Sequence, residues 1–345
     1  MIIENKDFKI SYFSTEQKEK IETFLSILRD NSKSISCKTS GSTGSPKVIE
    51  LSKKALMASA QNSIDFFKLN PKQSAILCMS VDFIAGKMML VRAMVAGLDL
   101  KVLPVSSDLS MLIEPADFIA LFPKQLRGLL ETSNGIKILK DSERILVGGA
   151  PIPSEIEGVL KSNKISIYQS YGMTETATHV ALKRAGYQAE DLYRAINGVS
   201  FGTKNGCLVI DYPTVLAEAI TTNDLVELTD AVTFKWLGRA DFVINTGGFK
   251  VSPEQLEAKL SSVLKCLFIA TGITDDEFGE RIGLIIKGAI PALGIQKETF
   301  KKILHPFEIP KSYVFINEFS QTSNGKIDRI KTAAKIKDGA WKNIL

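Results

Sequence analysis

The segment Thr39–Lys47, with the sequence TSGSTGSPK, gathers hydroxylated residues, two glycines and a lysine in one short run. Such a run offers exposed backbone N–H groups, side-chain donors and room for close approach, which is the combination that a polyphosphate requires. The GxxxxGK[ST] pattern of a Walker A loop is absent, and a strand is expected after the run where that motif has a helix. A flexible surface loop has the same composition, so both interpretations stay open on this segment alone.

A second candidate is Tyr171–Glu175, YGMTE, which follows the strand-like segment Ile165–Gln169. The tyrosine ring can stack on a base, and the Thr174 hydroxyl can donate to a phosphoryl oxygen. The Glu175 carboxylate offers the hard oxygen ligand that Mg²⁺ prefers. The alternative is a Tyr-Gly turn that ends a strand.

Two further segments carry polar groups near the end of the chain. Within Gly238–Val251, GRADFVINTGGFKV, residues Arg239 and Asp241 flank an inferred domain junction, where ligands commonly bind, and Gly247-Gly248 is typical of a turn. In Asn324–Arg329, NGKIDR, Lys326 follows Asn-Gly and, taken alone, is typical of a charged turn residue.

The elements that must position these residues alternate between short apolar runs and longer amphipathic stretches, which predicts an α/β protein. Strands are expected at Ser34–Lys38 and Val48–Leu51, on either side of the hydroxyl-rich run. Ser52 is typical of an N-cap, and a helix is expected from there to Asn70-Pro71. The further expected strands are Ala75–Met79, Lys101–Pro104, Phe118–Phe122, Arg144–Val147 and Ile165–Gln169, with helices at Lys87–Ala96 and Pro153–Lys161.

A second unit is expected to start near Gly238, which divides the chain into domains 1–237 and 238–345. Pro253–Leu264 predicts a helix with proline at its first position after Ser252. The pattern beyond it predicts a strand pair, a helix and a strand, at Leu267–Thr271, Gly283–Lys287, Lys297–Leu304 and Tyr313–Ile316. This content is typical of a small α+β domain.

Taken in order, these segments resemble the adenylate-forming superfamily of acyl-CoA synthetases, carrier-loading adenylation domains and luciferases. TSGSTGSPK resembles its phosphate loop, YGMTE its signature and NGKIDR its catalytic-lysine motif. The remaining matches are Gly148-Gly149-Ala150 to the adenine-side loop, Thr222-Asn223-Asp224-Leu225 to the ribose-binding segment and GRADFVINTGGFKV to the hinge. The short length, YGMTETA and IAGKMMLVRAM make the chain most similar to the short bacterial 2-succinylbenzoate–CoA ligases of menaquinone synthesis.

The resemblance implies a large layered α/β domain with a small, mobile α+β C-terminal domain. It also implies a two-step reaction in which a carboxylic acid and ATP form an acyl-AMP, and CoA then displaces AMP, with Mg²⁺ as the metal cofactor. The β- and γ-phosphates would contact Thr39, Ser40, Gly41, Ser42, Thr43, Gly44 and Lys47. Gly149, Ala150 and Tyr171 would line the adenine site, and Asp224 would accept the ribose hydroxyls, with Arg239 nearby.

For catalysis, the resemblance implies that Thr174 contacts the α-phosphoryl oxygens, that Glu175 ligates Mg²⁺ and that Lys326 approaches the attacking carboxylate. Asp241 would be the hinge, and Gly247 and Gly248 would reach the CoA tunnel after the small domain rotates. Two positions depart from the family pattern: Phe242 stands where a second acid is common, and Phe83 where a histidine is common.

The acyl pocket is expected near Phe83–Arg92 and Thr176–Val180. A second carboxylate on the substrate requires a buried cation, for which Lys87 is the first candidate and Arg92 the second. Lys87 has a solvated helix face as its alternative. His179 is expected to line the same pocket or to have a structural role.

Composition limits the other functions. The net charge of +5, from 43 basic and 38 acidic residues, is too small to indicate a nucleic-acid binder. Four isolated cysteines (Cys37, Cys78, Cys207 and Cys266) are typical of reduced intracellular thiols, and no leader or membrane-spanning segment is predicted, so a cytoplasmic protein is expected. Two histidines argue against a His-rich metal site and a Ser-His-Asp triad. The alternatives are another aryl or fatty acyl-CoA ligase, a carrier-loading adenylation enzyme and a silent nucleotide-binding module; no oligomeric state is predicted.

Overall fold

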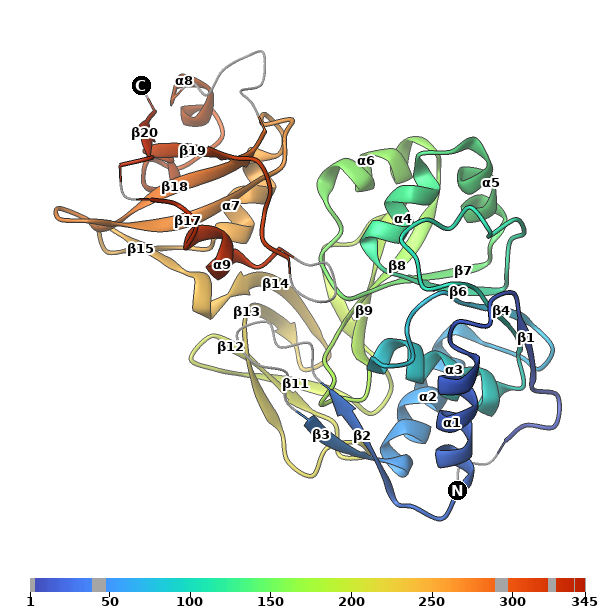
Figure 1. The fold of residues 1–345 in the computed structure, drawn as a ribbon. Helices are drawn as coiled ribbons and strands as arrows, with labels where there is room; N and C mark the ends of the chain where they lie inside the picture. Colours follow the sequence, from blue (N-terminus) through green and yellow to red (C-terminus); the bar gives the residue numbers. More distant parts are fainter. Residues whose placement is uncertain (1–3, 39–47, 289–296, 322–326, 338, 345) are drawn as a thin grey trace.

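The computed structural model describes residues 4–38, 48–288, 297–321, 327–337 and 339–344 (Figure 1). Its largest element is a twelve-stranded sheet with the order β1-β5-β4-β6-β7-β8-β9-β10-β14-β13-β12-β11. The first six strands of that order run parallel to one another, and every later pair is antiparallel. The parallel strands are β1 (Lys9–Tyr12), β5 (Asp99–Val102), β4 (Ser74–Leu77), β6 (Phe118–Leu121), β7 (Arg144–Val147) and β8 (Ser166–Gly172).

Helices cover both faces of the parallel strands. Alternate residues of β4 show this, because Ala75 and Leu77 belong to one buried cluster and Ile76 to another. The first cluster contains residues of α1 (Lys18–Arg29), α2 (Lys53–Phe67) and α3 (Ile84–Ala96). The second contains residues of α4 (Pro123–Leu130), α5 (Ser133–Asp141) and α6 (Ser154–Ser162).

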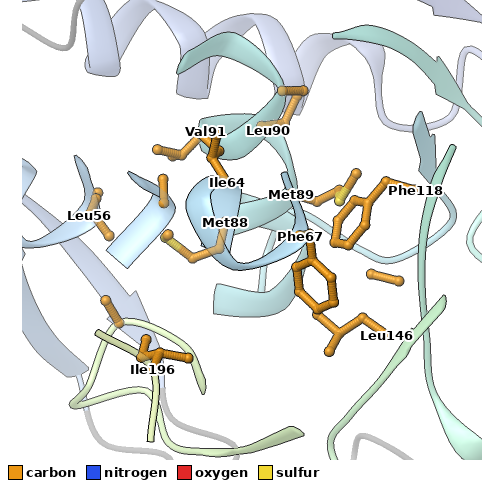
Figure 2. Packing of buried hydrophobic residues seen from close by; sticks show 14 of the residues in the cluster. Leu56, Ile64, Phe67, Met88, Met89, Leu90, Val91, Phe118, Leu146 and Ile196 are labelled. Atoms are coloured by element: carbon orange, nitrogen blue, oxygen red, sulfur yellow. The ribbon is translucent and has the colours of Figure 1, made fainter. Parts of the chain in front are cut away.

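The packing of α2 and α3 against the sheet forms the centre of the first cluster (Figure 2). Four consecutive residues of α3, Met88 to Val91, have 0% exposure, because this helix is covered on all sides. The ring of Phe67 lies 5.2 Å from that of Phe118 on β6. Trimming one of these side chains to alanine therefore costs about 2–5 kcal/mol of stability.

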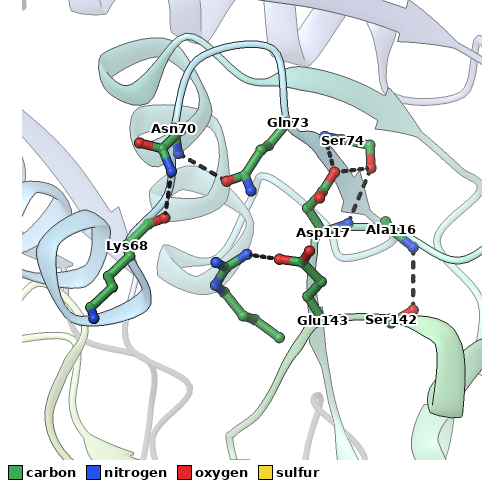
Figure 3. Close-up of polar contacts among 9 residues, drawn as sticks. Lys68, Asn70, Gln73, Ser74, Ala116, Asp117, Ser142 and Glu143 are labelled. Carbon is green, nitrogen blue, oxygen red and sulfur yellow. Dashed lines mark hydrogen bonds and ion pairs between the residues drawn. The ribbon is translucent and has the colours of Figure 1, made fainter.

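A set of polar contacts fixes the amino ends of the parallel strands (Figure 3). The backbone N–H and the hydroxyl of Ser74 both donate to Asp117 Oδ2 at 2.7 Å, which joins β4 to β6. The N–H of Ala116 donates to Ser142 Oγ at 3.2 Å, which joins the β6 entry to the end of α5. Since these contacts set the stagger of the strands, they also set which residues meet at the opposite, carboxyl edge.

The antiparallel half of the sheet consists of β9 (His179–Gly186), β10 (Tyr193–Ala195), β11 (Ser200–Lys204), β12 (Cys207–Asp211), β13 (Ile220–Asp230) and β14 (Thr233–Arg239). None of these strands was predicted from the sequence. The predicted strand Val48–Leu51 is found as β3 (Val48–Ser52), which pairs antiparallel with β2 (Ser34–Lys38). The Ser52 hydroxyl accepts from Ala55 N at 3.0 Å, so the predicted N-cap of α2 is confirmed.

The rest of the chain forms a second, six-stranded sheet with the order β16-β15-β18-β19-β20, in which β17 also pairs with β18. Its strands are β15 (Ile244–Thr246), β16 (Phe249–Val251), β17 (Phe268–Asp275), β18 (Gly279–Lys287), β19 (Ser312–Ile316) and β20 (Lys342–Asn343). The helical segments are η1 (Ala240–Phe242), α7 (Pro253–Leu260), α8 (Lys297–Lys301), η2 (Pro306–Glu308) and α9 (Arg329–Ala333). This part has buried clusters of its own.

The predicted α/β class is confirmed. The last strand of the large sheet ends at Arg239 and the first strand of the second sheet begins at Ile244, whereas the predicted division at 237/238 falls inside β14 and stays a prediction. Among the described residues, none of the helices combines the length and the apolar character needed to cross a membrane.

Candidate active site

The carboxyl edge of β7 and β8 brings two predicted segments together. These strands are parallel neighbours with Val147 opposite Gln169, so Gly149 and Ala150, just past β7, lie beside Tyr171 near the end of β8. Ligands of open α/β sheets bind at this edge. The structure therefore places the predicted adenine-side loop next to the predicted signature.

Asp224 is the centre of a polar cluster at the same place. This residue is only 8% exposed. Its carboxylate accepts hydrogen bonds from the Tyr171 hydroxyl at 2.7 Å and from the Trp236 indole N–H at 3.1 Å. Burial, together with the charge of Asp224, raises the pKa of Tyr171, so this phenol stays protonated and keeps donating. A carboxylate can accept about four hydrogen bonds, so Asp224 keeps the capacity to bind two further hydroxyls.

The predicted hinge residue, Asp241, and Arg239 lie close to Asp224. Arg239 on β14 pairs with Asp224 in the antiparallel register of β13 and β14. The Arg239 guanidinium donates to Asp241 Oδ2 at 2.7 Å, and the amide of Asn223 donates to both carboxylate oxygens of Asp241 at 3.1 and 3.2 Å. Burial lowers the pKa of Arg239, but the hydrogen bond to Asp241 and the charge of Asp224 outweigh that effect and raise it.

Thr174 and Glu175 lie in the connection between β8 and β9, and both are half-buried. The connection is held by Thr176, whose hydroxyl accepts from Met173 N at 3.2 Å and lies 2.7 Å from Thr178 O. The Glu175 carboxylate can supply one hard oxygen ligand to a metal ion. Across the described part of the chain, no three His, Cys, Asp or Glu residues cluster as metal ligands. A site with a single carboxylate fits Mg²⁺, which commonly binds through one or two carboxylates and completes its coordination shell with phosphates and water.

The structure separates the two candidate cations of the acyl pocket. Lys87 and Arg92 are five residues apart on α3, which places them about 140° apart around the helix. The Lys87 ammonium donates to Asp82 O at 3.3 Å and lies 5.6 Å from the centre of the Phe24 ring, toward α1. Phe83, the N-cap of α3, is half-buried at the start of the same helix.

Arg92 points to the other side and is 2% exposed. Its Nη2 donates to Thr178 Oγ1 at 3.0 Å, while its Nε has no hydrogen-bond partner and no carboxylate pairs with the guanidinium among the described residues. Burial lowers the pKa of Arg92 to about 10, so the group remains charged at neutral pH. A charged guanidinium that is nine-tenths buried and lacks an anion is suited to bind one from a ligand.

His179 lies beside Arg92 and is 3% exposed. Its Nε2 is 3.1 Å from Ser63 Oγ, and the Ser63 hydroxyl donates to Ser59 O at 3.0 Å, which leaves its oxygen to accept from Nε2–H. Burial, and then the charge of Arg92, lower the pKa of His179 well below its usual value. A neutral imidazole therefore lies next to the buried cation.

Gly247 and Gly248 form the turn between β15 and β16, with φ of +56° and +82°. Two consecutive positive φ values define the turn type that glycine favours in two-residue hairpins, so the turn interpretation is confirmed and the CoA-tunnel role stays a prediction. Another glycine, Gly86, is required by close approach, because a Cβ there would lie 2.3 Å from Ser80 O. The residues predicted to bind the phosphates, Thr39, Ser40, Gly41, Ser42, Thr43, Gly44 and Lys47, and the predicted catalytic Lys326 lie outside the described residues.

The sequence analysis missed Trp236 and Ser63, and it named Asn223 only as a member of the ribose-binding segment, with no role of its own. Trp236 and Asn223 contact Asp224 and Asp241 because β13 and β14 pair, and those strands were not predicted. Their alternation is detectable only weakly, since the polar residues Thr222, Asp224 and Thr233 occupy buried positions in these strands. Ser63 on α2 is 116 residues from His179, so no local pattern could have joined them.

Known proteins are similar to this chain over most of its length. The AMP-binding enzyme family matches residues 11–206. A probable 2-succinylbenzoate–CoA ligase of Mycobacterium tuberculosis is 29% identical over 338 residues, covering 89% of this chain and 87% of the relative. The 2-succinylbenzoate–CoA ligase of Listeria innocua is 24% identical over 351 residues, covering 93% and 74%.

Solved structures show the same similarity. An acyl-CoA synthetase (AMP-forming)/AMP-acid ligase II-like protein from Dyadobacter fermentans is 32% identical, with a TM-score of 0.62 over 94% of this chain and 95% of that one. The O-succinylbenzoate coenzyme A synthetase of Bacillus subtilis, in complex with ATP and magnesium ion, shares the fold with a TM-score of 0.70 at 18% identity, covering 86% and 69%.

This chain belongs to the AMP-binding enzyme family. The resemblance inferred from its motifs is confirmed, and so is the predicted class, an ATP-dependent, adenylate-forming acid–thiol ligase.

Proposed function

We propose that the protein joins 2-succinylbenzoate to CoA through an acyl-AMP intermediate, as a step of menaquinone biosynthesis in the cytoplasm. The names of the relatives from Mycobacterium tuberculosis and Listeria innocua support this substrate. The observation that carries the proposal is Arg92, a buried cation that has no carboxylate partner among the described residues and lies beside the loop that follows the YGMTE signature.

2-Succinylbenzoate has two carboxylates. One must react with ATP, and the other must be buried with the rest of the acid, which is unfavourable unless a cation meets it. Arg92 supplies that cation, and the fork of its guanidinium suits a carboxylate. The structure favours Arg92 over Lys87, whose ammonium faces Asp82 O and the Phe24 ring. We assign Phe83 and His179 to the apolar and neutral walls of the same pocket.

In the first half-reaction, a carboxylate oxygen of the acid attacks the α-phosphorus of ATP and the bond to pyrophosphate breaks. The barrier comes from bringing an anion to a polyanion, so the protein contributes mainly by position and charge. Asp224 binds the ribose hydroxyls, Gly149, Ala150 and Tyr171 surround the adenine, and Thr174 donates to the α-phosphoryl oxygens. The segment 39–47 binds the outer phosphates, and Lys326 neutralises the attacking carboxylate.

Mg²⁺, when bound, would neutralise phosphate charge, and Glu175 is the residue that would hold it. Arg239 stays near the ribose because Asp241 holds its guanidinium at 2.7 Å.

In the second half-reaction, the thiol sulfur of CoA attacks the acyl carbon and AMP leaves. For this step, the C-terminal domain, residues 238–345, rotates about Asp241. The rotation withdraws Lys326 and brings the Gly247-Gly248 turn to the entry of the CoA thiol. Because the groups for the two half-reactions act in turn, one active site can catalyse both.

The test is pyrophosphate release from ATP and Mg²⁺ with CoA, across 2-succinylbenzoate, benzoate, a medium-chain fatty acid and acetate. Two analogues of 2-succinylbenzoate that each keep only one of its carboxylates complete the panel. We expect strong turnover on 2-succinylbenzoate alone. Turnover on another acid would keep the ligase class and reject the substrate, and ATP binding without turnover on any acid would reject the ligase proposal in favour of a carrier-loading enzyme or a silent module.

A further inference from the structure

The connection between β8 and β9 is a tight turn whose two ends are joined by hydrogen bonds. Its centre is Thr176, which has 0% exposure and whose hydroxyl lies 3.0 Å from Met173 O and 2.7 Å from Thr178 O. Within the turn, Ala177 N donates to Thr174 O at 3.0 Å, and Thr178 N donates to Thr176 O at 2.7 Å. These bonds hold the two ends of the turn at a fixed separation.

The backbone leaves this turn little freedom to deform. Ala177 is buried and has a φ of +62°, a left-handed conformation that residues other than glycine rarely adopt. At the base of the turn, a Cβ at Gly172 would lie 2.3 Å from Thr178 O, so the end of β8 and the start of β9 are in close contact. Because closely packed groups transmit a displacement, a shift of Thr178 reaches the rest of the turn.

Arg92 contacts this turn from α3. Its Nη2 donates to Thr178 Oγ1 at 3.0 Å, although the two residues are 86 positions apart in the chain. A guanidinium carries five N–H groups, so one can stay on Thr178 while others bind a carboxylate. Thr178 is therefore a direct contact between the turn and the cation that we assign to the second carboxylate of the acid.

The same turn carries two side chains that we assign to ATP and Mg²⁺. Thr174 and Glu175 precede Thr178 by four and three positions, and both are half-buried. The bond from Ala177 N to Thr174 O joins the residue next to Thr178 to the first of these two. The acid's cation is thus bonded to one end of the turn, and the groups proposed for the α-phosphate and the metal lie near the other.

We propose that Thr178 is a positioning residue that couples the two substrates. A carboxylate bound at Arg92 fixes the guanidinium, the guanidinium fixes Thr178, and Thr178 fixes the turn that presents Thr174 and Glu175. The inference rests on the proposed function, from which the roles of Arg92, Thr174 and Glu175 come.

Two consequences follow from this coupling. The second carboxylate of the acid raises kcat for adenylation as well as affinity, because a contact remote from the reacting atoms is used to place catalytic groups. The acid and the nucleotide also strengthen each other's binding by the same factor, since coupling between two sites is reciprocal.

The first measurement follows binding without turnover. The probe is α,β-methylene-ATP with Mg²⁺, whose bridging carbon prevents adenylate formation, and its Kd is measured by calorimetry with and without saturating 2-succinylbenzoate. We expect the acid to tighten nucleotide binding to the wild type by about 5-fold or more. The analogue that keeps only the reacting carboxylate should change this Kd by less than about twofold. Thr178→Val keeps the branched shape without the hydroxyl, and it should lose the effect of 2-succinylbenzoate.

The second measurement is adenylation, followed as pyrophosphate release. We expect Thr178→Val to lower kcat on 2-succinylbenzoate by about 10-fold or more, and on the single-carboxylate analogue by less than about twofold. Thr178→Ser restores a hydroxyl and should recover the wild-type kcat within about threefold. Added to Arg92→Met, Thr178→Val should lower kcat by less than about twofold more, because the two residues act through one contact.

Thr271→Val is the matched control, because it makes the same change at a half-buried threonine of β17 in the second sheet, and it should alter neither measurement. Melting temperatures show that each variant is folded. If Thr178→Val does not fold, Thr178→Ala decides by the same criteria.

Three results would overturn the inference and leave the proposed function standing. They are equal losses of kcat on both acids, full additivity of Thr178→Val with Arg92→Met, and an effect of the acid on nucleotide binding that is absent from the wild type or kept in Thr178→Val. A wild type that does not adenylate 2-succinylbenzoate would overturn the proposed function, and the inference with it.

Discussion

Arg92 in the large sheet's unit and Arg329 in the second unit are both arginines with little exposure to solvent, 2% for Arg92 and 19% for the Arg329 side chain, but their surroundings differ. Arg329 has the carboxylate of Glu257 on its fork, a carbonyl beside it and an aromatic ring against it. Arg92 has one neutral hydroxyl, and among the described residues no anion. An isolated buried charge is unfavourable. The charge of Arg329 is neutralised within the protein, whereas the charge of Arg92 is neutralised only when an anion binds. The comparison distinguishes a group that holds the structure from one that holds a ligand.

The largest expected effect is the loss of stability on substitution of Arg329. Arg329→Met leaves Glu257 buried without its cation, and we expect the free energy of unfolding to fall by about 3–5 kcal/mol. Denaturant unfolding measures it. Arg329→Met with Glu257→Leu removes both charges and should recover most of the loss. A double variant as unstable as the single one would contradict the assigned pairing.

Substitution of Arg92 by methionine should instead lower activity. Arg92→Met removes an unpaired buried charge, so we expect unfolding to become less favourable by about 1–2 kcal/mol. The kcat/KM for 2-succinylbenzoate should fall by about 10²-fold, the equivalent of a charge-assisted contact.

The control acid is the analogue that keeps only the reacting carboxylate, for which Arg92→Met should change kcat/KM by less than about threefold. Lys87→Met, on the same helix, is the matched variant, and we expect it to lower kcat/KM by less than about threefold. Equal losses on both acids, or a destabilised Arg92→Met protein, would remove the contrast between the two arginines.

A smaller effect is expected from His179, which shares the Arg92 site. Its folded pKa is lowered by burial and by Arg92, so below the usual pKa of about 6.5 the unfolded chain binds a proton that the folded protein does not. Stability is therefore fully present above that pH and falls by about 1.4 kcal/mol per pH unit as the pH decreases toward the folded pKa. His179→Gln should remove this dependence from the unfolding curves. A parallel pH profile in the two proteins would show that His179 is not held neutral.

The smallest expected effect concerns the ring beside Arg329. Phe242→Leu keeps an apolar side chain but removes the cation–π contact, which is worth about 0.5–2 kcal/mol. We expect a matching decrease in the free energy of unfolding, measured by denaturant titration. No aromatic ring in the described part of the chain forms a cation–π contact with Arg92, so an effect at Phe242 sharpens the contrast between the two arginines. Combining Phe242→Leu with Arg329→Met should then add little to the loss of stability, whereas full additivity would exclude the contact.

Local patterns predicted much of the framework. The strand Arg144–Val147 and the N-caps Ser52 and Ser252 are found as predicted, because alternation and capping depend on residues a few positions apart. The strands from β9 to β14 were not predicted, since their exposed positions mix polar and apolar residues and their stability comes from pairing with neighbours. The order of motifs identified the family, but it did not reveal what holds each motif in place.

The sequence by itself determined the family, the α/β class and the set of candidate residues. Only the tertiary structure placed Tyr171 and Trp236 on Asp224, favoured Arg92 over Lys87, and paired Arg329 with Glu257. The physical reason is the separation along the chain of the residues that interact. A helix cap or strand is set by neighbours along the chain, whereas the Tyr171–Asp224, Arg92–Thr178 and Glu257–Arg329 contacts join residues 53, 86 and 72 positions apart. Whether a charge is paired depends on such contacts, which form only when the sheets are assembled.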